Sequence, residues 1–185
     1  MDATTQYALA YALSASAGLR ALLTMALASL AVHAGLFHPP PGFAWLGSTP
    51  VTVALFSVAL LEFLGDKIPG LDHALHFLQV VVKPAAAAVL VGGAIHAHSG
   101  PELYGLMALG ALNALGIHAA SATVRGASSV FSLGVANPFV SIFEDVTAVC
   151  MVVLSFLAPL VAAAVAIVIS VMIFRYGRRI LAHSQ

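Results

Sequence analysis

Long apolar runs separated by short polar connections are the feature that most constrains this chain. Only 8% of its 185 residues are charged, whereas 61% are hydrophobic, and the mean hydropathy is +1.03. A soluble domain carries roughly a quarter charged residues, because it needs a surface that water hydrates. This chain lacks the residues for such a surface, so lipid is its natural solvent. We expect an all-α, polytopic transmembrane helical bundle that forms a single domain over residues 1–185.

The apolar runs predict about six membrane-spanning helices. A crossing of about 30 Å needs roughly 20 apolar residues, because an α-helix rises about 1.5 Å per residue. Connections rich in Pro, Gly and Ser separate the runs, and the longest lies between residues 122 and 137. The expected spans cover residues 8–34, 50–65, 75–96, 103–123, 139–157 and 159–175.

Basic residues set the expected orientation, because cytoplasmic loops of membrane proteins carry an excess of Lys and Arg. Arg175, Arg178 and Arg179 follow the last span, which places the C-terminus in the cytoplasm. With six spans the N-terminus is also cytoplasmic, and Lys67 and Arg125 fall in cytoplasmic loops. The start of the chain lacks the positive charge of a signal peptide, so the first span is expected to be retained. The expected location is a bacterial inner membrane.

The first apolar run is too long for one crossing, and Arg20 lies near its middle, after Gly18. Either one tilted helix carries a buried arginine, or residues 4–18 form a partial or interfacial segment and the crossing begins near Arg20. We favour the long helix. Residues 15–21 also resemble residues 120–126, as Thr49-Pro50 resembles Asn137-Pro138. Such matches indicate two inverted three-helix repeats, as in many transporters, unless Ala- and Ser-rich runs match by chance.

Charged side chains inside the apolar runs are the main candidates for a functional site. Each costs roughly 2.5–3.5 kcal/mol at mid-membrane, so it normally faces a partner or a water-filled cavity. Arg20 and Lys83 are expected to pair with Glu62, Glu144 or Asp145 across the bundle. The polar groups converge on the cytoplasmic half, which favours a cavity there. The candidates for a transport or ion site are Arg20, Glu62, Asp66, Lys67, Asp72, Lys83, Arg125, Asn137, Ser141, Glu144 and Asp145.

Two segments supply most of these carboxylates. Glu62 and Asp66 share one helix face before Pro69-Gly70, where a broken helix end can expose carbonyls beside them. Asn137-Pro138 predicts a helix start, whose positive end favours the carboxylates that follow. Because adjacent helical residues point about 100° apart, one of Glu144 and Asp145 is expected to face the interior and the other the cytoplasmic edge. Solvated loop charges and purely structural ion pairs are the alternatives.

Metal and cofactor sites have little support in the sequence. Asp72, His73 and His76 lie close enough to form a weak zinc candidate, but no spacing forms a three-ligand set by itself. Cys150 is the single cysteine, so it is expected to be a small buried hydrophobic residue. No motif indicates a cofactor, and no basic face could hold nucleic acid. Membrane lipid is the expected partner. An ion or small solute and other copies of the chain in a homo-oligomer are further candidates.

Four polar segments carry a resemblance to a known family. They are Gly18-Leu19-Arg20, the stretch from Glu62 to Asp72, Lys83-Pro84, and Asn137-Pro138 with Ser141, Glu144 and Asp145. Together, and over essentially the whole chain, they resemble small bacterial membrane proteins catalogued as domain-of-unknown-function family 4126. The resemblance implies a membrane protein with these motifs as its signature, and it implies no activity. Where its members often carry Arg, this chain has Lys83, which keeps the charge but loses the bidentate fork.

Three functions are compatible with these residues. The favoured one is a channel or transporter for an ion or small solute, with the carboxylates lining a site that the basic residues balance. A lipid-phosphate enzyme or flippase is the first alternative, because Glu62 with Arg125, Ser128 and Ser129 loosely resembles polyprenyl-diphosphate phosphatases. The second alternative is a scaffold subunit in which the ion pairs fix helix register. Enzymatic activity is therefore the less favoured expectation.

Overall fold

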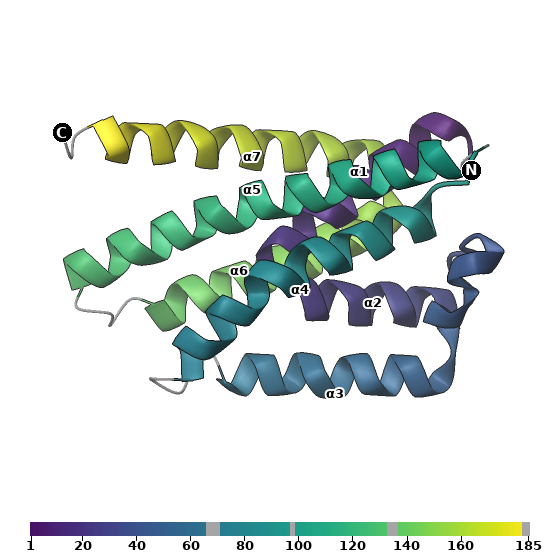
Figure 1. The fold of residues 1–185 in the computed structure, drawn as a ribbon, viewed down its shortest axis with the longest axis horizontal. Helices are drawn as coiled ribbons and strands as arrows, with labels where there is room; N and C mark the ends of the chain where they lie inside the picture. Colours follow the sequence, from purple (N-terminus) through teal and green to yellow (C-terminus); the bar gives the residue numbers. More distant parts are fainter. Residues whose placement is uncertain (66–70, 97–98, 133–136, 183–185) are drawn as a thin grey trace.

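The computed structural model is all-helical, as the sequence predicts (Figure 1). It describes residues 1–65, 71–96, 99–132 and 137–182, without the side chains of 71–77, 127, 129–132, 173, 174 and 176–182. In these ranges the elements are α1 (Ala3–Leu19), α2 (Ala21–His33), the 3-10 helix η1 (Pro41–Gly47), α3 (Thr49–Gly65), α4 (Leu71–Ala94), α5 (Gly100–Ser132), α6 (Asn137–Leu157) and α7 (Pro159–Ala182).

Five predicted spans correspond to helices α3 to α7. The predicted connection between the fourth and fifth spans, residues 122–137, is wrong in part, because helix α5 continues to Ser132. Gly and Ser lower helix stability by only about 1 kcal/mol or less each, so a packed helix can continue through them. Two helical segments, Gly100–Gly126 and Asn137–Leu157, are long and apolar enough to span a membrane, and the pair η1 and α3, bent by 62°, would be a third.

The prediction that residues 8–34 form one continuous helix is wrong. Arg20 has extended backbone, with φ −137° and ψ 90°, and separates α1 from α2. The two helices run antiparallel (Figure 1). The hydroxyl oxygens of Ser16 and Thr24 are 2.9 Å apart, whereas eight residues of continuous helix would rise about 12 Å. One helix over residues 8–34 would be about 40 Å long, and folding back instead carries Arg20 to polar partners inside the bundle.

The start of α1 lies at the end of the bundle where α4 ends and α5 begins. The His96 backbone N–H donates to Gln6 Oε1 at 2.9 Å, and the Tyr7 hydroxyl donates to Glu102 Oε1 at 3.3 Å. The C-terminal end of α7 lies at the opposite end of the bundle (Figure 1). The start of α1 and the end of α7 therefore lie at opposite ends of the bundle, because the segment expected to form the first crossing is a hairpin that returns to its starting end.

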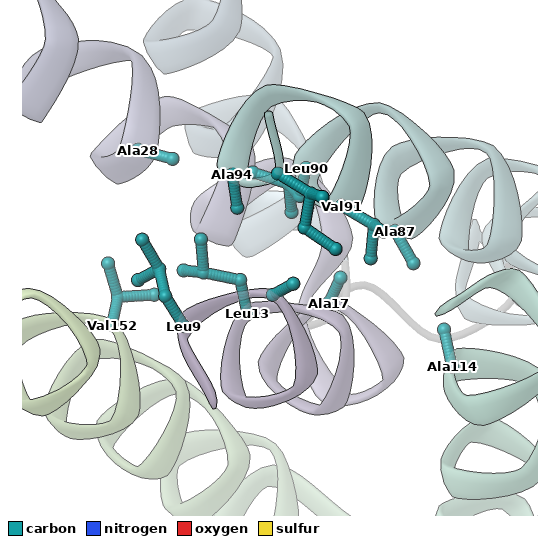
Figure 2. Close-up of a cluster of buried hydrophobic side chains, with 12 residues drawn as sticks. Leu9, Leu13, Ala17, Ala28, Ala87, Leu90, Val91, Ala94, Ala114 and Val152 are labelled. Carbon is teal, nitrogen blue, oxygen red and sulfur yellow. The ribbon is translucent and has the colours of Figure 1, made fainter. Parts of the chain in front are cut away.

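Helix α1 forms the centre of the bundle, where its side chains pack against α2, α4, α5 and α6 in one core cluster (Figure 2) and against α5, α6 and α7 in a second. Small residues on these surfaces let the helix backbones approach closely. A Cβ added at Gly18 would lie 2.8 Å from Ile117 Cβ and 2.9 Å from the Ala114 carbonyl oxygen, so only glycine fits there. The core around the hairpin contains Leu9, Leu13, Ala17, Ala28, Ala87, Leu90, Val91, Ala94, Ala114 and Val152. This packing fixes the position of Arg20.

Candidate functional site

Arg20 lies at the tip of the α1–α2 hairpin and is only 2% exposed. Its Nε lies 2.7 Å from Asp145 Oδ1, and its Nη2 lies 3.8 Å from Glu144 Oε2. The same Nη2 donates to the Ser141 hydroxyl and to the Ser141 carbonyl oxygen, the latter at 3.3 Å. Residues three and four apart share a helix face, so α6 presents all these groups to the tip. The predicted pairing of Arg20 with the α6 carboxylates is confirmed.

Glu144 connects the hairpin tip to α5. Arg125 forms an ion pair with Glu144 Oε2, and its Nε lies 3.5 Å from Oε1, which also accepts a hydrogen bond from Ser121. Both Glu144 and Asp145 therefore face Arg20, and the prediction that one of them faces the cytoplasmic edge is wrong. The physical reason is the width of the guanidinium, whose planar fork of five N–H donors reaches two adjacent carboxylates.

Lys83 and Glu62 make contacts on the α4 side of this region. Lys83 Nζ lies 2.9 Å from His118 Nδ1, and Glu62 Oε1 accepts from Gln79 Nε2 at 2.9 Å. A charged ammonium can only donate, so His118 Nδ1 is then the acceptor and Nε2 carries the ring proton. The predicted direct pairing of Lys83 with a carboxylate is replaced by this contact, although the charges of Glu144 and Glu62 also act on Lys83.

Six residues that carry a formal charge thus gather in the half of the bundle where α3 and α5 end and α4 and α6 begin. We call them the charge cluster. Their formal charges sum to zero, which offsets part of the cost of placing charge at membrane depth. The charged side chains converge on one half of the bundle, as the sequence predicts. The charge cluster consists of Arg20, Lys83, Arg125, Glu62, Glu144 and Asp145.

A cavity of about 310 Å³ adjoins the charge cluster. Arg20, Glu62 and Asp145 line it from the hairpin tip, α3 and α6. The volume lies at the lower end of the range of about 300–1,000 Å³ that small-molecule sites occupy. A small ligand in this cavity would therefore touch the ion pairs directly. The other lining residues are apolar: Leu23, Phe56, Ala59, Leu60, Phe63 and Val149.

Several predicted site residues are not placed in this arrangement. Asn137 begins α6, and Asp72 belongs to the backbone of α4. Asp66 and Lys67, and the side chains of Asp72, His73 and His76, lie outside the described residues. Within the part of the chain that is described, no three His, Cys, Asp or Glu side chains come together as a metal site.

Sequence reasoning missed two hydrogen-bonding members of the site. Ser121 lies four residues before Arg125, so a shared helix face was the available signal. Gln79 carries no comparable signal.

The prediction that Cys150 is buried is also wrong, because this residue is exposed. It lies on the face of α6 away from the buried Glu144 and Ala148.

The sequence matches, over residues 7–179, the family described as "Domain of unknown function (DUF4126)". The chain belongs to this family. No curated protein and no solved structure matches the chain. The whole charge cluster lies within the matched residues. Because the family description assigns no activity, the cluster and its cavity are the basis for a functional proposal.

Proposed function

We propose that this protein is a membrane transporter for a small ion or solute, and that the charge cluster and its cavity form the transport site. One observation carries the proposal: the chain breaks its helix at Arg20 inside the bundle and docks the break on two carboxylates beside a cavity. Non-helical backbone at membrane depth is tolerated where it is buried in protein or lines a cavity. Broken helices that point their ends at a polar site are typical of transporters.

The length of the hairpin supports a tip that ends inside the membrane. At about 1.5 Å per residue, α1 with 17 residues extends about 26 Å and α2 with 13 residues about 20 Å. Both are shorter than a hydrocarbon layer of about 30 Å. The positive N-terminal end of α2 adds to the charge of Arg20 at the tip. The attraction between this tip and the α6 carboxylates therefore holds the hairpin in place.

Glu144 is the group through which a ligand would act on the hairpin. It faces Arg20, Arg125 and Ser121 at once. A proton or cation that neutralises this carboxylate removes the shared partner of two arginines. Arg20 keeps Asp145 and Ser141, but the loss of the Glu144 charge weakens the attraction between the tip and α6, so the tip is held less tightly. Occupancy of the site and the position of the hairpin are coupled in this way. Because occupancy of the site changes the position of the hairpin, the mechanism is that of a carrier.

Membrane location and orientation belong to the same proposal. Arg125 and Arg175 lie in the C-terminal parts of α5 and α7, and these two helices end at the same end of the bundle (Figure 1). Arg178 and Arg179 follow in the sequence. This end is cytoplasmic by the positive-inside rule, and the membrane is the bacterial inner membrane. The charge cluster then lies in the cytoplasmic half and the N-terminus on the other side.

The two alternative functions have less support. The residues that a lipid-phosphate enzyme would combine have different partners, since Arg125 pairs with Glu144 and Glu62 accepts from Gln79. A scaffold subunit would use the ion pairs to fix helix register, but it would not need the cavity that adjoins them.

Ion flux into liposomes tests the proposal. Wild-type protein is reconstituted and exposed to gradients of protons, K⁺ and Mg²⁺, and flux of at least one probe is expected. Glu144→Gln should reduce that flux at least tenfold, because it removes the charge that the arginines share. Glu102→Gln makes the same chemical change at the opposite end of the bundle and should keep wild-type flux.

A second variant protects the test against a folding defect. If Glu144→Gln is not recovered folded, Asp145→Asn takes its place with the same expectation. Absence of flux for every probe in the wild-type protein would end the proposal. Equal flux in wild type and the folded cluster variant would do the same.

A further inference from the structure

A second cavity, of about 410 Å³, lies between α5 and α7. It shares no lining residue with the cavity at the charge cluster. The two helices diverge toward the end of the bundle where the chain ends (Figure 1). We call this cavity the α5–α7 groove. Its lining residues are Leu112, Asn113, Gly116, Ile117, Ala120, Ser170, Val171 and Arg175.

The groove opens on a surface that faces lipid. Leu109 and Leu112 of α5 are each 63% exposed, and Val168 and Met172 of α7 are more than half exposed. In a membrane these side chains contact acyl chains. Protein interiors contain few voids. An empty groove is unfavourable because the side chains along its walls lose dispersion contacts. An acyl chain is the component of the membrane that can fill an apolar groove of this shape.

Arg175 is the only charged side chain among the described residues that line the groove. The other polar lining residues are satisfied within the protein: Asn113 Nδ2 donates to Ser14 at 2.8 Å, and the Ser170 hydroxyl to the Ala166 carbonyl oxygen at 2.8 Å. Arg175 is exposed, and no carboxylate of the described residues forms an ion pair with it.

The depth of Arg175 matches that of lipid phosphates. It lies 16 residues after Pro159, the first residue of α7, which corresponds to about 24 Å along the helix. In a hydrocarbon layer of about 30 Å, a long arginine side chain at this depth reaches the boundary. Guanidinium groups bind phosphate oxygens through two parallel hydrogen bonds.

We infer that the α5–α7 groove binds an anionic phospholipid, with one acyl chain along the groove and the phosphate against Arg175. Basic pockets between transmembrane helices on the cytoplasmic side bind anionic headgroups in this way. The inference does not depend on transport, because it uses neither the charge cluster nor its cavity.

Two variants separate the headgroup from the acyl chain. Arg175→Gln removes the cation. Gly116→Leu fills the groove, because a Cβ added at Gly116 meets no atom within 4 Å and so points into open space. Gly105→Leu is the matched control, since a Cβ at Gly105 also meets nothing within 4 Å and Gly105 does not line the groove. If Gly116→Leu is not recovered folded, Ala120→Leu replaces it.

Native mass spectrometry measures the lipid that each protein retains. Purified protein is incubated with equimolar phosphatidylglycerol and phosphatidylcholine of identical acyl chains. Wild type should retain the anionic lipid about fivefold more, the factor that one basic residue near a charged membrane surface supplies. Arg175→Gln should abolish this preference. Gly116→Leu should lower retention of both lipids severalfold, while Gly105→Leu should behave as wild type.

Three results would overturn the lipid site. The first is an unchanged headgroup preference in Arg175→Gln. The second is equal lipid retention by the Gly116→Leu and Gly105→Leu variants. The third is displacement of phosphatidylglycerol by inorganic phosphate at the same concentration, which would assign Arg175 to a soluble anion.

Discussion

Replacing Gly18 with alanine should destabilise the bundle, because it pushes the hairpin tip away from α5. The new Cβ would lie 2.8 Å from Ile117 Cβ and 2.9 Å from the Ala114 carbonyl oxygen. The carbonyl belongs to the backbone of a packed helix, so it has no rotamer through which to move aside. The tip itself has to shift, and Arg20, two residues later, shifts with it.

Two effects of opposite sign set the magnitude. Alanine stabilises a helix relative to glycine by about 1 kcal/mol, and Gly18 lies in the last turn of α1. Overpacking of a closely packed contact costs about 1–3 kcal/mol. Displacement of Arg20 weakens its contacts with α6 in addition. We therefore expect a net loss of about 1–2 kcal/mol in the free energy of unfolding.

Unfolding in mixed micelles with increasing dodecyl sulfate, followed by far-ultraviolet circular dichroism, measures this loss. Gly105→Ala is the matched control. A Cβ at Gly105 meets no atom within 4 Å, so only the helix preference counts and stability should stay the same or rise by up to about 1 kcal/mol. If Gly18→Ala were as stable as Gly105→Ala, the docking of the tip against α5 would be refuted.

Three further predictions concern the ion pair, the helix cap and the termini. Arg20→Leu should cost about 3–5 kcal/mol because it removes the cation that Glu144 and Asp145 both face, and Arg20→Leu/Asp145→Leu should cost less than the sum of the single changes. Additive unfolding energies would contradict this. Hydrogen bonds from Thr5 lower the pKa of Asp2, so this cap stabilises the start of α1 above the ordinary carboxyl pKa and is lost as the pH falls through the lowered value. Amide exchange at Thr5, relative to an unfolded peptide, should rise in acid in wild type but not in Asp2→Asn, and an acid response in both would contradict the cap. Reporters fused to the two chain ends should mark opposite sides of the membrane, and a same-side result would contradict the hairpin.

Hydrophobicity and local punctuation predict most helices of this fold. Helices α3 and α6 begin at Thr49 and Asn137, each followed by proline, which is a strong mark of a helix start. The hairpin has no comparable mark, because residues 8–34 form one apolar run whose pattern gives no position for a bend. Its excess length, Gly18 and Arg20 were the available signals. They indicate where the chain breaks, but the return of α2 depends on packing against helices distant in sequence.

The candidate site was predictable where charge alone decides the partner. A buried arginine needs an opposite charge, and few carboxylates lie in the apolar runs, so the partners of Arg20 could be inferred. Lys83 contacts His118, a neutral ring that charge pairing does not select. Both Glu144 and Asp145 reach one guanidinium because its fork is wide, which helical periodicity alone does not predict.

The most direct test of the transport mechanism is to fix the hairpin to α6 and measure flux. The Ser16 hydroxyl donates to the Ala148 carbonyl oxygen at 3.2 Å, so α1 and α6 are in contact at these two residues. In a Cys150→Ser background, Ser16→Cys with Ala148→Cys should form a disulfide on oxidation. The proposed mechanism predicts that flux into liposomes is lost on oxidation and returns on reduction. Equal flux through the oxidised and reduced proteins would contradict it.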